Sequence, residues 1–311
     1  MNILILGSGG VGGYFGARLI EVGVEITFFV KKKRATLIKN NGIYIESPHG
    51  NLHVPANTLS VGDAKQKFDL VILTCKAYDL ESSLDDLTKV LSEIPIFLPL
   101  LNGISHIEYL RNRFGNNKVL GGAAHIASIL TSKNVVKQLN PIQILTIGSI
   151  GTDLETIALE FKKICEEANF KTIYTKDILQ ALWDKWTFLA TLAGSTTLFN
   201  ACVGDITSIK VGANLMKKMY KEALSVAEIE NHKVDIKAQK KALEILMKPS
   251  SDFTSSMLRD LQSKKRTEHE HILGDLVRIG VQKKLDLPLL TSAYVNISIA
   301  TQGQNMAMDI K

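Results

Sequence analysis

The pattern of apolar and polar positions divides the chain into two parts. In the first part, short apolar runs alternate with segments of helical periodicity, which is typical of β-α-β units on a parallel sheet. The runs expected as parallel strands are Asn2–Leu6, Glu25–Val30, Asp69–Thr74 and Ile96–Leu101. From Asp177 onward, only helical periodicity remains. The pattern therefore predicts a strand-and-helix part followed by a part made of helices alone.

Two longer apolar segments follow the four runs. Residues 118–130 and 135–149 flank the polar turn "TSKN", and we expect them to form an antiparallel hairpin added to the same sheet. A helix from about Asp153 to Ala168 and a last strand, "KTIYT", close the first part. We predict an α/β Rossmann-type dinucleotide-binding domain over residues 1–174 and an all-helical domain over residues 175–311.

The first expected strand leads directly into a glycine-rich turn and a helix. Gly7, Gly9 and Gly12 stand in G-x-G-x-x-G register, in the strand–turn–helix context that dinucleotide binding requires. The first glycine permits the turn, the second lets a pyrophosphate approach the backbone, and the third allows close packing of the helix, which Gly16 would extend. The alternative is a glycine-rich turn without a ligand. The predicted cofactor-binding residues of this loop are Gly7, Ser8, Gly9, Gly10, Val11 and Gly12.

The end of the second expected strand indicates which nucleotide binds. NAD-binding forms usually carry an acidic residue about 20 residues beyond the loop, where it binds the ribose 2′-hydroxyl. This chain has "KKKR", Lys31 to Arg34, in that place. Because these cations would attract a 2′-phosphate, we expect NADPH rather than NADH. The alternative is a solvated charge run at a helix start.

Lys76 and Asn102 come just after the third and fourth expected strands. In open α/β sheets, ligands gather at the carboxyl ends of the strands, so both side chains are expected at the cofactor cleft. Each residue alone could be an ordinary loop residue. Together with the glycine loop they outline one pocket.

Lys185 is an ammonium group on an apolar helical stripe. The residues that share its face are all apolar: Ile178, Ala181, Leu182, Phe188, Leu189, Leu192 and Ala193. Desolvation would lower the pKa of Lys185 toward neutrality, which suits a group that protonates a carbonyl oxygen while a nicotinamide cofactor delivers hydride to carbon. The alternative is a lysine whose stem is buried while its head reaches water.

The C-terminal part supplies candidate partners for this lysine. Ser255 and Ser256 stand at an expected helix start, which suits a carboxylate. Glu268 heads a stripe continued by Ile272, Leu276 and Ile279, and it would face inward to pair with an ammonium. His269 and His271 are two residues apart on a helix and point in different directions, so we expect solvated side chains rather than metal ligands.

Composition excludes several classes of function. The chain has 311 residues, of which 45% are hydrophobic and 22% charged, as in a globular protein. Its net charge of +6 comes mainly from scattered lysines, so nucleic-acid binding is disfavoured. Three distant cysteines suggest neither disulfides nor a zinc site. No apolar run reaches the roughly 20 residues of a membrane span, and the N-terminus does not resemble a signal peptide, so we expect a cytoplasmic protein.

Five motifs in order carry a resemblance to a known family: "GSGGVG", "CKAYD", "LNG", "LWDKW", and "SSMLRD" followed by "RTE". The chain resembles ketopantoate reductase, also called 2-dehydropantoate 2-reductase. The resemblance implies an NADP-dependent oxidoreductase acting on CH–OH, with a Rossmann domain, a helical domain and the substrate between them. It would reduce 2-dehydropantoate to (R)-pantoate in pantothenate and coenzyme A biosynthesis.

The resemblance also implies residue roles. Lys185 corresponds to the catalytic lysine, Glu268 to its glutamate partner near the cofactor, and Ser256 to the serine that binds the substrate carboxylate. Lys76 and Asn102 correspond to positions where cofactor and substrate meet. Lys31 stands where the family usually has an arginine for the 2′-phosphate, a change that keeps the charge but loses the planar fork.

The chain departs from the family at three positions where members with established ketopantoate activity often carry asparagine: Leu189, Ala193 and Val203. Losing contacts to a buried hydroxyl can cost about 1–3 kcal/mol each, which could change the preferred substrate. The alternatives are a reductase of a different branched 2-oxo acid or β-hydroxy acid, and a non-catalytic NADPH-binding sensor. The oligomeric state stays open, with a homodimer through the helical domain as one option.

Overall fold

The structure, a computed structural model, describes the backbone of residues 1–308 and the side chains of residues 1–302. The chain forms two compact units. Unit 1 comprises Met1–Leu101 and His106–Ala181, and unit 2 comprises Asn102–Ser105 together with the chain from Leu182 onward. The division falls inside helix α6 (Ile178–Phe199), shortly after the predicted boundary at residue 175. The start of α6 groups with unit 1 because Ile178 packs against Gly121, where an added Cβ would lie 2.6 Å from it.

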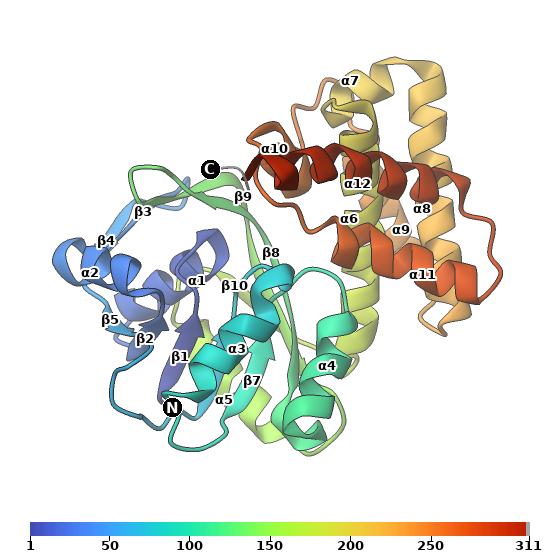
Figure 1. The fold of residues 1–311 in the computed structure, drawn as a ribbon. Helices are drawn as coiled ribbons and strands as arrows, with labels where there is room; N and C mark the ends of the chain where they lie inside the picture. The colour runs from blue at the N-terminus through green and yellow to red at the C-terminus, as the bar shows by residue number, and fades with distance from the viewer. Residues whose placement is uncertain (309–311) are drawn as a thin grey trace. The chain divides into compact units, whose positions relative to one another are not determined.

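Unit 1 contains a five-stranded parallel sheet in the order β5-β2-β1-β6-β7 (Figure 1). Its strands are β1 (Ile3–Leu6), β2 (Ile26–Phe29), β5 (Asn57–Leu59), β6 (Leu70–Leu73) and β7 (Ile96–Pro99). Every residue of β1, β2 and β6 is buried, as expected of parallel strands covered on both faces. The four predicted parallel strands are confirmed, and β5 is an addition at the edge beside β2.

Helices connect these strands. They are α1 (Gly10–Glu21), α2 (Lys32–Asn41), α3 (Leu80–Thr88) and α4 (Ser105–Phe114), with short 3₁₀ turns at Ala77–Asp79 and Asn116–Lys118. Because β1 is central and leads directly into α1, the glycine-rich turn lies at the carboxyl edge of the sheet. The carboxyl edge of an open α/β sheet is where nucleotides bind.

A second sheet holds the predicted hairpin. Its strands are β3 (Ile43–Glu46), β4 (Leu52–Val54), β8 (Leu120–Leu130), β9 (Val135–Ser149) and β10 (Lys171–Tyr174). The order is β10-β9-β3-β4, and β8 pairs with β9. The hairpin itself is confirmed, but its strands belong to this second sheet, and it meets the parallel sheet only at an isolated bridge, among the described residues, between Val119 and Phe97 of β7. Its long strand β9 pairs instead with β3 near its start and with β10 near its end, and α5 (Glu155–Glu166) precedes β10.

The regular elements of unit 2 within its described residues are all helices, as predicted. After α6 come α7 (Val203–Ser208), α8 (Lys210–Ile229), α9 (Ile236–Leu246), α10 (Ser256–Gln262), a π-helical turn (Glu270–Gly274), α11 (Asp275–Gln282) and α12 (Pro288–Met308). Its core gathers Trp183 and Trp186 of α6, Met219 and Val226 of α8, and Leu290 of α12. Within residues 1–308, no helix has the length and hydropathy needed to cross a membrane.

Candidate dinucleotide and catalytic sites

The glycine loop joins β1 to α1, and Gly12 of the loop and Gly16 beyond it let α1 pack closely on the sheet. Gly7 adopts φ +99°, a conformation that side chains disfavour. A Cβ on Gly12 would overlap Thr74 Oγ1 and the Gly7 carbonyl oxygen. One on Gly16 would lie 2.5 Å from the Phe28 ring and 2.7 Å from Ile5. The helix therefore packs closely on the sheet at Gly12 and Gly16, as the motif predicts.

Gly9 differs from these glycines, because no neighbouring atom would prevent a side chain at this position. A Cβ there would have no neighbour within 4 Å, and its φ of −77° is open to any residue. Gly9 is the N-cap of α1, makes no side-chain capping bond, and is followed by no acidic residue in the first turn. The helix N-terminus thus presents backbone N–H groups and open space, which are the features that fit a phosphate. The residues present fit a bound dinucleotide.

The four cations after β2 lie in two different settings. Lys31 is the N-cap of α2, and Lys31, Lys32 and Lys33 are exposed. Arg34 is half-buried, and its Nε donates to Ser8 Oγ at 2.9 Å. The structure therefore brings Arg34, which the sequence did not single out from the lysines, against the glycine loop.

Lys76 and Asn102 belong to different compact units. Lys76 follows β6, directly before the 3₁₀ turn, and is half-buried in the unit that holds the glycine loop. Asn102 belongs to unit 2, where its Nδ2 donates to Glu268 Oε2 at 3.3 Å. Asn102 is thus placed with the predicted catalytic residues.

The segment Asn102–Ser105 is attached to the helical turn that follows Glu268. Ser105 Oγ donates to Asp275 Oδ2 at 2.6 Å. Gly103 has φ +78°, and an added Cβ would lie 2.6 Å from the His271 carbonyl oxygen. These contacts hold the segment, and with it Asn102, close to the turn.

Lys185 lies on a face of α6 that is only half-buried. Ala181, Phe188 and Leu189 share this face and are also half-buried. The apolar stripe is therefore open around Lys185, whereas its other members are buried: Ile178, Leu182, Leu192 and Ala193. Thr187 and Thr191 are also fully buried, each 0% exposed. Their burial is tolerated because each hydroxyl donates to a backbone carbonyl one turn earlier, at 3.1 and 2.8 Å.

Lys185 and Glu268 form an electrostatically coupled pair. Burial lowers the pKa of Lys185 to about 8, and the nearby Glu268 carboxylate opposes this shift. Glu268 is 5% exposed and stands directly before the last helical turns, where its carbonyl accepts from Ile272 N at 3.0 Å. The inward orientation predicted for Glu268 is observed. The structure thus brings together Lys185, Glu268 and Asn102.

Trp186 fixes the two segments that carry this pair. Its Nε1 donates to the Ile272 carbonyl at 2.9 Å, and the side chain is 1% exposed. Ile272 lies in the π-helical turn Glu270–Gly274, a type of irregularity that is frequent at functional sites. A buried bond between the residue after Lys185 and this turn sets the register of the two elements.

The two serines at the start of α10 have separate roles. Ser255 is the N-cap: its Oγ accepts from Leu258 N at 3.0 Å and hydrogen-bonds Thr196 Oγ1 at 2.8 Å. Ser256 is half-buried, and none of the hydrogen bonds found among the described residues involves its hydroxyl. Of the two serines, only Ser256 thus has a hydroxyl that is not used in capping, and its role in binding a substrate carboxylate stays a prediction.

We expected the two histidines after Glu268 to be solvated, and this expectation is wrong. His269 and His271 are both half-buried. His269 Nδ1 lies 2.7 Å from Thr267 Oγ1, and burial lowers the pKa of His269 below its usual value. Among the described residues, no group of three or more histidine, cysteine or acidic side chains is arranged to hold a metal ion.

Only one of the three apolar departures from the family pattern, Leu189, is not fully buried. Leu189 is half-buried beside Lys185. Ala193 is 1% exposed and Val203 is 0% exposed, and both are part of the hydrophobic core. Any effect of these departures on substrate preference therefore falls mainly on Leu189.

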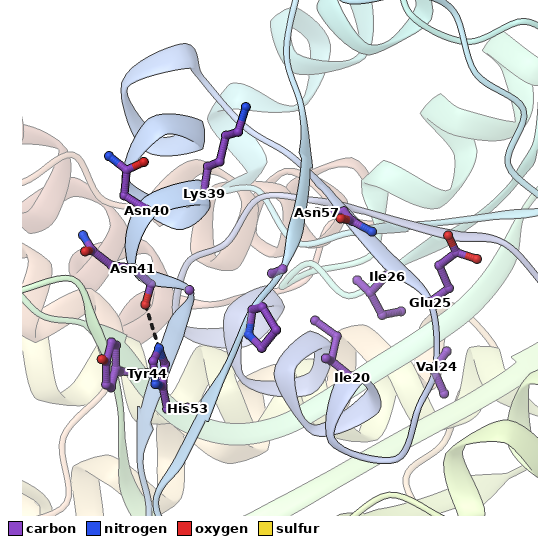
Figure 2. A pocket seen from close by; sticks show the side chains of 13 residues that line it. Ile20, Val24, Glu25, Ile26, Lys39, Asn40, Asn41, Tyr44, His53 and Asn57 are labelled. Carbon is purple, nitrogen blue, oxygen red and sulfur yellow. Dashed lines mark hydrogen bonds between the residues drawn. The ribbon is translucent and has the colours of Figure 1, made fainter.

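A surface hollow of about 650 Å³ in unit 1 is not the dinucleotide site (Figure 2). It is lined by the ends of α1 and α2, the start of β2 and the β3–β4 strands. Tyr44 and His53 stack at 3.7 Å on one side, and His53 Nε2 lies 2.8 Å from the Asn41 carbonyl oxygen. The hollow opens at the amino end of β2, whereas nucleotides bind at carboxyl ends.

A parallel sheet with an open glycine loop, followed by a helical unit in which a half-buried lysine is paired with a buried glutamate, defines the class of two-domain Rossmann oxidoreductases. Comparison with known families narrows this class to one family. Residues 3–151 match the profile described as "Ketopantoate reductase PanE/ApbA", and residues 177–300 match its C-terminal counterpart. The chain belongs to the ketopantoate reductase family.

Individual relatives span nearly the whole chain. "Uncharacterized oxidoreductase YkpB" of Bacillus subtilis is 30% identical, covering 96% of this chain and 98% of its own length. A 2-dehydropantoate 2-reductase of Pyrococcus horikoshii is 27% identical, covering 93% and 94%. Among solved structures, a Ralstonia eutropha ketopantoate reductase family member has a TM-score of 0.88 at 21% identity, covering 98% of this chain and 100% of its own.

A D-mandelate dehydrogenase solved with NADH and anilino(oxo)acetate also has a TM-score of 0.88, at 20% identity and 98% and 100% coverage. At this identity the likeness shows the shared fold. The structural neighbours thus include oxidoreductases named for two different substrates.

Proposed function

We propose that this protein is an NADPH-dependent reductase that converts 2-dehydropantoate to (R)-pantoate on the route to pantothenate and coenzyme A. The observation that carries the proposal is the Lys185–Glu268 pair, in which burial lowers the pKa of the lysine to about 8. A lysine with this pKa remains protonated at neutral pH and gives up its proton more readily than an ordinary lysine.

The residues have distinct tasks in the proposed reaction. The nicotinamide, when bound, supplies the hydride. Lys185 donates a proton to the carbonyl oxygen, and its positive charge stabilises the alkoxide that develops there. Glu268 holds the ammonium in position, and Asn102 donates a hydrogen bond to that carboxylate. The free hydroxyl of Ser256 binds the substrate carboxylate, and Lys76 lies in the unit that holds the glycine loop.

A second candidate function is the reduction of a 2-oxo acid that lacks the hydroxyl group of 2-dehydropantoate. Leu189 favours it, because this half-buried side chain shares the face of Lys185 and offers no hydrogen bond. A substrate hydroxyl buried against leucine would lose about 1–3 kcal/mol relative to one that is paired.

The test measures NADPH oxidation by absorbance with 2-dehydropantoate and a panel of 2-oxo acids that carry aliphatic or phenyl side chains. We expect Lys185→Ala to lower turnover by roughly 10²- to 10⁴-fold, the usual contribution of a general acid, with NADPH affinity nearly unchanged. Lys210→Ala, an exposed lysine at the start of α8, is the matched control. Undiminished turnover in Lys185→Ala would refute the role of the lysine. Tight NADPH binding without oxidation of any substrate would support the sensor alternative.

A further inference from the structure

Arg34 combines partial burial with contacts to the glycine loop. Its Nε donates to Ser8 Oγ at 2.9 Å and its NH2 to the Ser8 carbonyl at 3.4 Å. NH1 donates to Asn134 Oδ1, in the turn between β8 and β9, at 3.0 Å. The guanidinium is thus held over the loop residue that separates Gly7 from Gly9. The three lysines before it are exposed and have no such contacts with the loop.

The charge of Arg34 is not neutralised by the protein. All three of its acceptors are uncharged, and none of the ion pairs found among the described residues includes it. Burial lowers the pKa of Arg34, and no carboxylate among the described residues is found to offset this shift. A partly desolvated cation without a counter-ion costs free energy that a bound anion would recover.

The position of this cation indicates which anion it would meet. In Rossmann folds, the adenosine ribose binds beside the end of the second strand and the glycine loop, and an arginine there accommodates the 2′-phosphate of NADP. Arg34 reaches from the first turn of α2, just after β2, back to Ser8 of the loop. Of its five N–H groups, three have acceptors in the protein, which leaves two for phosphate oxygens.

We propose that Arg34, rather than Lys31, is the residue that selects NADPH over NADH, by binding the 2′-phosphate. The proposal rests on dinucleotide binding by unit 1 in the proposed function. Lys31 and its neighbours contribute a general attraction for anions that is screened by salt. Arg34 contributes directed, charge-assisted hydrogen bonds from a preorganised planar group.

The experiment measures binding calorimetrically in the full-length protein, with 2′,5′-ADP and 5′-ADP as probes, so that no turnover is needed. We expect Arg34→Gln to weaken 2′,5′-ADP binding by roughly 10- to 100-fold, as loss of charged hydrogen bonds would, and to change 5′-ADP binding less than about twofold. Lys31→Gln is the matched control, with an expected loss of less than about threefold for 2′,5′-ADP. Arg34→Lys should recover only part of the affinity, because lysine lacks the fork.

Each other outcome overturns the assignment. Equal weakening of both probes by Arg34→Gln would mean that Arg34 only supports the loop through Ser8. A selective loss in Lys31→Gln without one in Arg34→Gln would transfer the role to Lys31. A wild-type protein without preference for 2′,5′-ADP would remove the subsite altogether. Failure of the reductase proposal is separate: a protein that prefers 2′,5′-ADP through Arg34 but reduces no 2-oxo acid would lose only the proposed activity.

Discussion

Alanine at Gly9 should separate ligand binding from folding. The site is open, with no atom within 4 Å of an added Cβ, and the backbone already has φ −77° and ψ −158°. The methyl group therefore causes no clash. Alanine has fewer conformations than glycine in the unfolded chain, which would raise the free energy of unfolding by about 0.4–1 kcal/mol. Alanine is also a poorer N-cap than glycine, which would lower the free energy of unfolding by a few tenths of a kcal/mol. We expect a net change within about 1 kcal/mol.

Dinucleotide affinity should respond strongly to the same substitution. The added methyl group would occupy the space through which the pyrophosphate approaches the N-terminus of α1. Each hydrogen bond to a charged phosphate contributes about 1.5–3 kcal/mol, so losing one weakens binding roughly 10- to 100-fold. The same variant should therefore fold normally and bind NADPH poorly.

Gly12→Ala provides the contrast in the same loop. Its methyl group would overlap Thr74 Oγ1 and the Gly7 carbonyl oxygen, an overpacking that costs about 1–3 kcal/mol. Thermal unfolding and NADPH titration calorimetry on both variants are the assays. If Gly9→Ala bound NADPH as tightly as the wild type, the loop would not cradle a phosphate. If Gly9→Ala unfolded at as low a temperature as Gly12→Ala, the conclusion that the Gly9 position has room for a methyl group would be wrong.

Two further predictions concern pH and stability. Because Lys185 must be protonated to act and its pKa is about 8, the reduction rate should be constant below that pH and fall as pH rises through it; a kcat profile that stays flat to about pH 10 would contradict this. Glu222 accepts from Leu289 N and Leu290 N at 2.9–3.1 Å at the start of α12, so Glu222→Ala should cost about 1–2 kcal/mol in urea unfolding. Glu228 is an exposed residue on α8, the helix that also carries Glu222, and Glu228→Ala should cost less than about 0.5 kcal/mol. Equal losses of stability in the two variants would refute the capping role of Glu222.

The sequence pattern located the buried parallel strands because each is a short, mainly apolar run. It did not reveal β5, which has three residues, or β3, whose buried and exposed positions alternate. The hairpin was recognisable from its turn, but its neighbours were not. Which sheet receives β9 depends on pairing with β3 and β10, segments distant in the chain whose register no local pattern encodes.

Some residues of the candidate site could be singled out from the sequence, and others could not. Residue type and spacing identified Lys185 and Glu268, since a charged group on an apolar stripe is visible in the sequence. Burial of Thr187 was not, because a threonine reads as polar until its hydroxyl finds a backbone carbonyl. Arg34 could not be distinguished from Lys31 by sequence either. What separates the two cations is a contact with Ser8 across the loop.

The assignment of Asn102–Ser105 to unit 2 has a consequence for how this protein can be divided. The helical half is not encoded by one continuous stretch, because four residues of it are inserted early in the chain. A chimera that joins residues 1–181 to the helical half of a relative would combine this insert with a foreign docking surface for Gly103 and Ser105. Recombination between family members therefore needs to exchange residues 102–105 together with everything after residue 181.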